Sequence, residues 1–340
     1  MVPWIECPTI DLDWDRPPAL RYADVPDQVV EHARLLLAAI ENEIPARAKL
    51  LADAIRLRTA GRFHAEVKAL ADRVGAGWRT VLLGNVSYDL SLAIMGCSTV
   101  ALPTAAGPVL ARNMDWWPED ILARTTYRIR GFQNGRLAFA HAGWPGAVGV
   151  VTGLSARGFA VALNAVLCPD GVDRTGYPVL LHIRRVLDDA EDFDSAVKML
   201  SEQRLAAPCL LTLVGRQNDQ RVVIERSPRR CAIRRPEPGK PLVTTNDYRL
   251  LYKPKTSDES EIYQTTCDRF TALSRFFADH RPDQAVEDVA LLYVLSDPVI
   301  IQGITAQHVI ARPAANELRV FVPRRLVEPP SCGFGPFRAD

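Results

Sequence analysis

The stretch that decides the fold is residues 96–115, which read GCSTVALPTAAGPVLARNMD. Residues 97–102 form a short apolar run, residues 103–108 contain the Pro and Gly of a turn, and residues 109–112 resume the apolar pattern. Two such runs around a turn predict a β-hairpin. Because the residues before Gly96 have a helical pattern, we expect the chain to change from helix to sheet here.

The first 96 residues are expected to form a helical unit. Residues 1–25 are rich in Pro and Asp and predict an irregular arm with at most a short strand. Over residues 26–57 apolar side chains recur at helical spacing, and a proline suits the first turn. Residues 62–74 and 80–95 predict two further helices.

The chain beyond the hairpin alternates between groups of strands and groups of helices. We predict strands over residues 126–131, 137–141, 148–152, 159–165, 209–214, 221–225, 231–234, 241–245, 307–311 and 317–321, and helices over residues 178–187, 192–203, 265–279 and 284–295. This order lacks the strict βαβ alternation of a parallel sheet. It predicts an α+β protein with two antiparallel sheets and helices outside them.

The composition is that of an ordinary soluble globular protein. The chain has 340 residues, 24% charged side chains and a net charge of +1, which does not indicate nucleic acid or an anionic membrane as a partner. No stretch reaches the roughly 20 apolar residues of a transmembrane helix, and the first ten residues do not form a signal peptide. We therefore expect a cytoplasmic protein.

The seven cysteines show no CxxC pair and no spacing typical of a metal site. Cys97 alone has a distinctive context, at the junction of the two halves. It is either a small buried hydrophobic residue or a nucleophile. Arg112 and Asp115 lie at the far end of the hairpin, which returns them towards Cys97. An arginine would favour the thiolate and a carboxylate would orient an amine, whereas the alternative is a salt bridge on the surface.

Two asparagines are further candidates for the site. Asn164 ends the apolar stretch 159–164, where an unpartnered buried amide would cost about 1–3 kcal/mol. Asn246 lies in a polar cluster directly after the apolar residues 241–243, where the alternative reading is a simple turn. Both side-chain amides suit an oxyanion. Nearby aromatic residues would line an apolar acyl pocket or belong to the core: Trp116, Trp117, Trp144, Phe159 and Tyr248.

In order and spacing, these motifs resemble the N-terminal-nucleophile (Ntn) cysteine hydrolases. The particular likeness is to the acid ceramidase and N-acylethanolamine acid amidase group, related to choloylglycine hydrolase and penicillin V acylase. The residues that carry it are Ile10-Asp11-Leu12-Asp13 with Pro17-Pro18, Leu82-Leu83-Gly84-Asn85 through Tyr88, Cys97-Ser98-Thr99, Arg112-Asn113-Met114-Asp115-Trp116, Asn134-Gly135, Thr245-Asn246-Asp247-Tyr248 and Asp268-Arg269.

The resemblance implies a four-layer αββα sandwich and a chain that cuts itself between Gly96 and Cys97. Residues 1–96 would be the first fragment, and residues 97–340 the catalytic domain. The implied roles are Cys97 as nucleophile, Arg112 and Asp115 flanking it, Asn164 and Asn246 placing the oxyanion and the amine, and Arg269 closing the site. No cofactor or metal is implied.

The reason for cleavage is chemical. A free α-amine has a pKa of about 7.7–8.0 and a thiol about 8.5, so the amine of an N-terminal Cys97 is a base poised near neutral pH. In the intact chain that nitrogen is an amide and cannot take a proton. Cleavage therefore creates the base, and Gly96 tolerates the strained turn that the attack needs.

The expected reaction is hydrolysis of a linear N-acyl amide C–N bond through a Cys97 thioester. The partners are a small-molecule amide and the two fragments, which stay associated, and homo-oligomer formation is left open. One alternative is an acyltransferase that passes the acyl group to an amine or alcohol. The other is an unprocessed binding protein of the same fold. Ala165 stands where the acid ceramidase group carries glutamate, which argues against that group's lipid amides more than against the reaction.

Overall fold

Two β-sheets form the centre of the molecule. The computed structural model describes residues 3–41, 49–90, 95–253 and 261–328. One sheet has the strand order β1-β14-β13-β4-β3-β12, and the other has the order β11-β10-β9-β8-β7-β6-β5-β2. The strands are β1 (Trp4–Glu6), β2 (Thr9–Asp13), β3 (Met95–Leu102), β4 (Val109–Trp116), β5 (Tyr127–Gln133), β6 (Arg136–Gly143), β7 (Thr152–Ser155), β8 (Phe159–Asn164), β9 (Cys209–Val214), β10 (Arg221–Arg226), β11 (Cys231–Arg234), β12 (Leu242–Thr244), β13 (Thr305–Arg312) and β14 (Glu317–Pro323).

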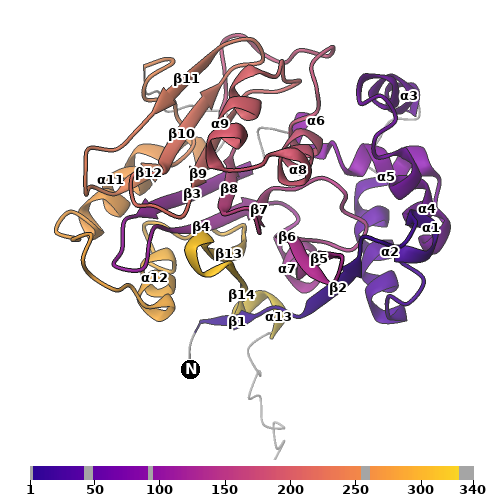
Figure 1. Cartoon of the computed structure of the whole chain (residues 1–340), viewed down its shortest axis with the longest axis horizontal. Helices are drawn as coiled ribbons and strands as arrows, with labels where there is room; N and C mark the ends of the chain where they lie inside the picture. The colour runs from indigo at the N-terminus through magenta and orange to yellow at the C-terminus, as the bar shows by residue number, and fades with distance from the viewer. Residues whose placement is uncertain (1–2, 42–48, 91–94, 254–260, 329–340) are drawn as a thin grey trace, which may run out of the picture.

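Helices surround the sheets, with the N-terminal helices α1–α5 on one side and α11 and α12 on the opposite side (Figure 1). They are α1 (Pro18–Arg21), α2 (Asp27–Glu41), α3 (Lys49–Arg58), α4 (His64–Val74), α5 (Trp78–Gly84), α6 (Ser87–Leu90), α7 (Glu119–Arg124), α8 (Val179–Asp189), α9 (Phe193–Glu202), α10 (Glu261–Gln264), α11 (Thr266–Phe276), α12 (Asp288–Leu295) and α13 (Arg324–Val327), with one 3-10 turn, η3 (Pro313–Ala315). Within the described ranges, no helix is both long and apolar enough to span a membrane.

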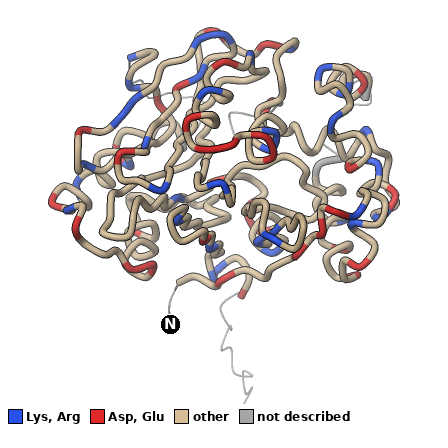
Figure 2. The backbone as a smooth tube through the Cα atoms, in the orientation of Figure 1, with Lys and Arg blue, Asp and Glu red and all other residues tan. Residues whose placement is uncertain are grey.

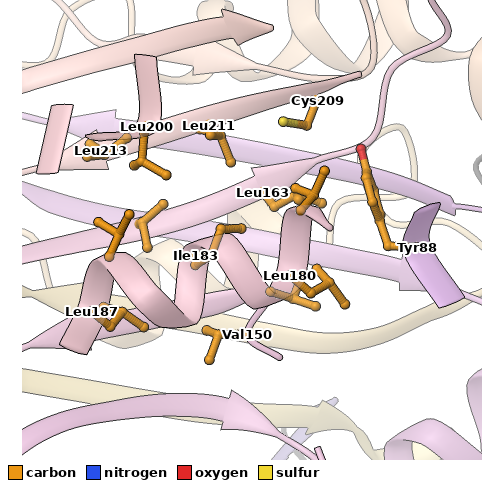
Figure 3. Packing of buried hydrophobic residues seen from close by; sticks show 14 of the residues in the cluster. Tyr88, Val150, Leu163, Leu180, Ile183, Leu187, Leu200, Cys209, Leu211 and Leu213 are labelled. Atoms are coloured by element: carbon orange, nitrogen blue, oxygen red, sulfur yellow. The ribbon is translucent and has the colours of Figure 1, made fainter. Parts of the chain in front are cut away.

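Successive side chains along a strand point into two different apolar layers. On β3, Ala101 packs between the sheets with residues of β8 such as Ala160, while Val100 faces the opposite side and packs with Leu273 of α11 and Leu292 of α12. On the far side of the eight-stranded sheet, α8 and α9 cover β8 and β9. Helix α8 directs Leu180, Ile183 and Leu187 towards Leu163, Leu211 and Leu213 (Figure 3). The predicted α+β sandwich with αββα layers is confirmed.

Nearly all strand pairs are antiparallel, as predicted. Among the described strands, β2 and β5 alone pair in parallel, at the edge of the eight-stranded sheet. Acidic and basic residues are interspersed along the chain, without a large region of one sign (Figure 2). This even distribution fits the small net charge.

The arm predicted over residues 1–25, for which a short strand was considered, contains two short strands and the short helix α1. Strand β1 pairs with β14 in the six-stranded sheet, and β2 pairs with β5 in the eight-stranded sheet. Both strands are short and lie at sheet edges, so the partner strands rather than local periodicity decide their pairing. The N-terminal unit is therefore helices plus one edge strand of each sheet.

Two further boundaries differ from the sequence prediction. Strand β3 begins at Met95 rather than at Cys97, because Met95 and Gly96 pair with Trp116 and Asp115. The third predicted helix divides into α5 and α6, and residues 91–94 lie outside the described residues.

The strand predicted over residues 148–152 is not formed as such. β7 begins only at Thr152, and the preceding backbone N–H groups of Val148 and Gly149 donate to the side chain of Asn85. The backbone N–H of Val150 donates to the carbonyl of Leu180. Asn85, at the C-terminal end of α5, and the first turn of α8 thus accept the hydrogen bonds that a neighbouring strand would otherwise accept.

Asp89 joins α6 to the first turn of α8. Its Oδ1 accepts the backbone N–H of Val179 at 3.1 Å, while Oδ2 is buried without a hydrogen-bond partner among the described residues. Burial raises the pKa of Asp89 to about 7, and the bond from Val179 opposes that rise. The carboxylate is therefore costly to bury once it is ionised.

We expect Asp89→Asn to stabilise the protein increasingly as the pH rises. A folded-state pKa near 7 lies above the ordinary value of 3.8, so the stability contributed by the protonated form is present below about pH 3.8 and lost as pH rises through 7. The asparagine keeps the acceptor for Val179 and never ionises. The check is the melting temperature of both proteins from pH 4 to pH 8; a difference that stays constant with pH would contradict the explanation.

Candidate active site

The β3–β4 hairpin brings the predicted residues together. In its register Gly96 lies opposite Asp115, Cys97 opposite Met114, and Thr99 opposite Arg112. Cys97, Arg112 and Asp115 are all buried, the latter two completely. The reading of Arg112 and Asp115 as a surface salt bridge is therefore wrong.

Arg112 contacts the sulfur of Cys97 directly. Its Nη2 donates to Sγ at 2.6 Å, and its Nη1 donates to the hydroxyl of Thr152 at 2.7 Å. The sulfur lies 3.5 Å from the carbonyl oxygen of Leu163, to which the thiol donates. Burial raises the pKa of the Cys97 thiol, the charge of Arg112 opposes that rise, and Asp115 adds to it. In the intact chain the sulfur is thus held as a thiol beside a cation that stabilises its ionised form.

Asn246 and Arg269 hold the backbone of Cys97. The backbone N–H of Cys97 donates to Oδ1 of Asn246 at 3.1 Å, and Nη2 of Arg269 donates to the same oxygen at 2.8 Å. Nη1 of Arg269 donates to the carbonyl oxygen of Cys97 at 2.7 Å and to the hydroxyl of Ser98 at 2.9 Å. The backbone N–H and the backbone carbonyl of Cys97 therefore both have fixed polar partners.

Asp115 keeps one carboxylate oxygen unused. Its Oδ1 accepts a hydrogen bond from the hydroxyl of Thr305 at 2.6 Å, whereas its Oδ2 is buried and has no partner within the described part of the chain. Burial raises the pKa of Asp115, and Arg269, Thr305 and Arg112 oppose that rise. A carboxyl group with a raised pKa, paired in register with Gly96, is suited to exchange a proton near the Gly96–Cys97 peptide bond.

The side-chain amide of Asn164 is fully engaged in hydrogen bonds to its neighbours. Its Nδ2 donates to the backbone carbonyls of Thr244 and Thr245, each at 3.1 Å, and its Oδ1 accepts from the hydroxyl of Thr99 at 2.7 Å. Both amide hydrogens are thus in use. In this arrangement Asn164 fixes the segment that carries Asn246, and its predicted oxyanion role stays a prediction.

Sequence reasoning missed the hydroxyl groups that orient the site. Thr152 supports Arg112, Thr305 supports Asp115, and the hydroxyl of Thr266 accepts the backbone N–H of Asn246 at 2.8 Å. Thr99 supports Asn164. Threonine is common in strands for reasons of packing alone, so these positions carry no signal in a single sequence.

Comparisons with known proteins place the chain in a family. Residues 103–289, more than half of the chain, match the model of the acyl-coenzyme A:6-aminopenicillanic acid acyl-transferase family. The chain belongs to this family. The match includes Arg112, Asp115, Asn164, Asn246 and Arg269 and begins six residues after Cys97.

Curated relatives of this chain are named as acid amidases and acid ceramidases. The N-acylethanolamine-hydrolyzing acid amidase of Caenorhabditis elegans is 22% identical over 236 residues, which cover 64% of this chain and 66% of the relative. The same enzyme of Oryctolagus cuniculus is 27% identical over 179 residues, 48% of each chain, and the acid ceramidase of Heterocephalus glaber is 25% identical over 194 residues, covering 49% and 47%. The chain thus spans between about half and two thirds of these relatives.

A solved structure of similar fold supports the architecture described above. The N-acylethanolamine-hydrolyzing acid amidase ortholog of Caenorhabditis elegans superposes with a TM-score of 0.53 at 21% identity, over 64% of this chain and 93% of that chain. The predicted resemblance to the acid amidase and acid ceramidase group is confirmed, as is the Ntn-hydrolase fold.

The aromatic residues predicted to line a pocket do not form one group in the structure. Trp116 and Trp144 are buried and meet edge to face, with ring centroids 5.7 Å apart. Trp117 is 50% exposed, and the hydroxyl of Tyr248 donates to the carbonyl of Arg226. Phe159 lies in the core under α8. Trp117 is thus half exposed and Tyr248 is tied to β10, and their predicted place in a substrate pocket stays a prediction.

A narrow apolar cavity lies beside Trp144. Its lining comes from β2, β5 and β6 and from the N-terminal helices α2 and α4, and includes Val30, Ala33, Leu70, Ile129 and Trp144. Trp144 thus links the cavity to Trp116, whose strand neighbour across the hairpin is Met95. Among the described residues, no group of three or more side chains has the arrangement of a metal site.

Proposed function

We propose that this chain is a self-processing cysteine amidohydrolase that cleaves a linear N-acyl amide through a Cys97 thioester. One observation carries the proposal: both reactive atoms of Cys97 have buried partners, with the nitrogen 3.1 Å from Oδ1 of Asn246 and the sulfur 2.6 Å from Nη2 of Arg112. A buried cysteine that only fills space does not need a cation at its sulfur.

In maturation, the sulfur of Cys97 attacks the carbonyl carbon of Gly96. The Gly96–Cys97 amide bond breaks, the acyl group passes to sulfur, and the nitrogen takes a proton and becomes the α-amine of Cys97. Asp115, opposite Gly96, is placed to carry that proton, and Arg269 holds the Cys97 carbonyl in place. Water then hydrolyses the thioester and releases the carboxyl group of Gly96.

In turnover, the same sulfur attacks the carbonyl of the substrate amide. The α-amine of Cys97 takes the thiol proton and gives it to the leaving amine, since its ordinary pKa lies near neutral pH. Oδ1 of Asn246 and the free Oδ2 of Asp115 are the acceptors for the ammonium form. Water then attacks the thioester, which releases the acid and restores the thiol.

The released segment, residues 1–96, is expected to stay bound. Its helices contribute Val30, Val67 and Leu83 to one apolar cluster with Ile129 and Leu181 of the larger fragment. The ion pair between Glu66 and Arg184, at 3.3 Å, is also buried across this boundary. If the segment left, this apolar face would be exposed to water, which is unfavourable. Cleavage of one peptide bond should therefore not release the segment.

The test of the proposed function is the intact mass of the purified wild-type protein with its elution on size exclusion. We expect two masses, for fragments that begin at Met1 and Cys97, in one peak. A single uncut chain that also hydrolyses no N-acyl amide would favour the alternative of a binding protein. A small fragment that elutes by itself would contradict the association.

The cavity beside Trp144 is proposed to take the acyl chain. Ala33 lines it from α2 and is buried, so Ala33→Leu fills space that a long acyl group would need. We expect kcat/KM for long-chain N-acyl amides to fall at least about tenfold, with a smaller effect on short-chain amides. The control is Ala52→Leu, an equally buried alanine of α3 outside the cavity, and an equal effect of both variants at every chain length would contradict the assignment.

Acyl transfer is the second candidate function, because the matched family is named for it. The two reactions share the thioester and differ only in what attacks it. Product analysis with an added amine, such as hydroxylamine, distinguishes them. A hydroxamate that forms at the expense of the free acid, at low amine concentration, would favour the transferase.

A further inference from the structure

His141 lines the apolar cavity from the sheet side. It lies on β6, is 2% exposed, and faces the N-terminal helices together with Ile129 and Trp144. Gly143, two residues further along the same face, leaves room for its ring. A Cβ atom at Gly143 would lie 2.7 Å from both Cε1 and Nδ1 of His141, so any other residue would displace the imidazole.

The imidazole has an unfilled hydrogen-bonding position. Its Nδ1 is buried and has no partner among the residues that the structure describes. Burial and, to a smaller extent, the charge of Arg184 together lower the pKa of His141 to about 3, so the ring is neutral at neutral pH. A neutral imidazole has one donor and one acceptor nitrogen. Leaving either unpaired in an apolar cavity costs about 1–3 kcal/mol.

The buried charged pair of the cavity is Glu66 with Arg184, while Nε of Arg73 is buried without a hydrogen-bond partner among the described residues. Glu66 accepts from the hydroxyl of Tyr22 at 2.6 Å and from Nη2 of Arg184 at 3.3 Å, and Arg21 lies 3.5 Å from it. Arg73 binds Asp27 at 3.0 Å. A ligand ammonium group would be repelled by Arg184, and a ligand carboxylate would compete with Glu66 for it, whereas a neutral polar group meets His141 without disturbing the Glu66–Arg184 pair.

We propose that the cavity selects an acyl chain that carries a hydroxyl group, which hydrogen-bonds to Nδ1 of His141. A hydroxyl both donates and accepts, so it complements either tautomer of the ring. This inference rests on the proposed function, because it treats the cavity as the acyl site of the Cys97 thioester. It adds the chemical class of the acyl group, which the motifs leave open.

The sheet register gives the position of that hydroxyl. His141 pairs with Gly153, and Gly153 pairs with Val161, two residues before Leu163, whose carbonyl contacts the sulfur of Cys97. Two strand spacings and two residues of rise place the backbone of His141 about 12 Å from that of Leu163. The hydroxyl therefore belongs in the distal half of a medium-length chain, not beside the carbonyl.

The first experiment uses the wild-type protein and matched substrates. We would measure kcat/KM for a medium-chain N-acyl amide and for a positional series with one hydroxyl moved stepwise along the distal half of its chain. The expected result is a maximum at one position, at least about tenfold above the unsubstituted amide, which corresponds to one buried hydrogen bond. Hydrolysis of all the substrates at equal or falling efficiency would overturn the inference but leave the proposed function intact.

The second experiment measures binding without turnover. Calorimetry with the free medium-chain acids, with and without the hydroxyl, should show the same preference in Kd. Selective binding without amide hydrolysis would overturn the proposed function while supporting the cavity's preference. Equal affinity for the two acids would overturn the preference.

The variant His141→Leu links the preference to the imidazole. We expect the ratio of kcat/KM for the hydroxylated over the plain amide to fall to about one. The matched control is His182→Leu, since His182 is as buried as His141, its Nδ1 also lacks a partner within the described ranges, and it does not line the cavity. A preference that survives in His141→Leu would assign the hydroxyl to another residue. If His141→Leu does not fold, the wild-type comparisons above still decide the question.

Discussion

Cys97→Ala is expected to remain a single chain and to hydrolyse no N-acyl amide. The alanine has no sulfur to receive the acyl group of Gly96, so both the N-to-S shift and the later thioester are lost. Arg112 would keep its bond to Thr152, and the Cys97 backbone contacts to Asn246 and Arg269 do not depend on the sulfur. The fold should therefore persist, and the loss in activity should reach the background rate.

The measurements are intact mass and turnover after prolonged incubation. Cys209→Ala is the matched control, because Cys209 is a fully buried cysteine of β9 whose pKa is raised to about 12 by burial and which has no role in the proposed chemistry. It should be cut as the wild type is. Cleavage of Cys97→Ala at the same bond would show that another protease or nucleophile acts there, and self-processing would be wrong.

Asn246→Ala in already processed protein is expected to lose about 3 kcal/mol of transition-state stabilisation, about a hundredfold in kcat/KM. The Asn246 side chain gives one oxygen to both the nitrogen of Cys97 and Nη2 of Arg269, and its Nδ2 is fixed by the carbonyl of Ala165 at 2.8 Å. Without it the amine loses an oriented acceptor, and a buried arginine loses one partner.

The assay needs a panel of chromogenic N-acyl amides and a mass spectrum of each preparation, because a maturation defect would imitate a catalytic one. Asn218→Ala is the control. Asn218 also exchanges two hydrogen bonds with the backbone, at Thr104, but at the turn end of the same hairpin. Turnover near the wild-type value by processed Asn246→Ala would remove Asn246 from the site.

The hairpin and most strands follow directly from the sequence pattern. Residues 97–112 show two apolar runs around a turn, and this alone places Arg112 and Asp115 near Cys97. The pattern does not reveal β1 and β2, because three- and five-residue edge strands have no periodicity of their own. Nor does it separate Asn164 from Asn246. Their difference lies in which backbone carbonyls are near, and only the sheet packing fixes that.

Aromatic residues and hydroxyls were the least predictable parts of the site. Trp116 and Trp117 are neighbours in sequence, yet one packs on Trp144 and the other is half exposed, since successive residues at the end of a strand point to opposite sides. Thr152 and Thr305 touch Arg112 and Asp115 from strands far along the chain. Such contacts depend on strand register, which short-range patterns do not specify.

The edge strands β1 and β2 have a consequence for how the protein recovers from denaturation. They give the first fragment a strand in each sheet, so the native sheets are completed by a segment that maturation would separate covalently. A newly made chain folds in a first-order process, with all strands on one polypeptide. The cut protein would have to find its missing strands in a second-order reaction, whose yield falls on dilution. Heating beyond the melting point would then inactivate the mature form irreversibly at concentrations where its precursor recovers.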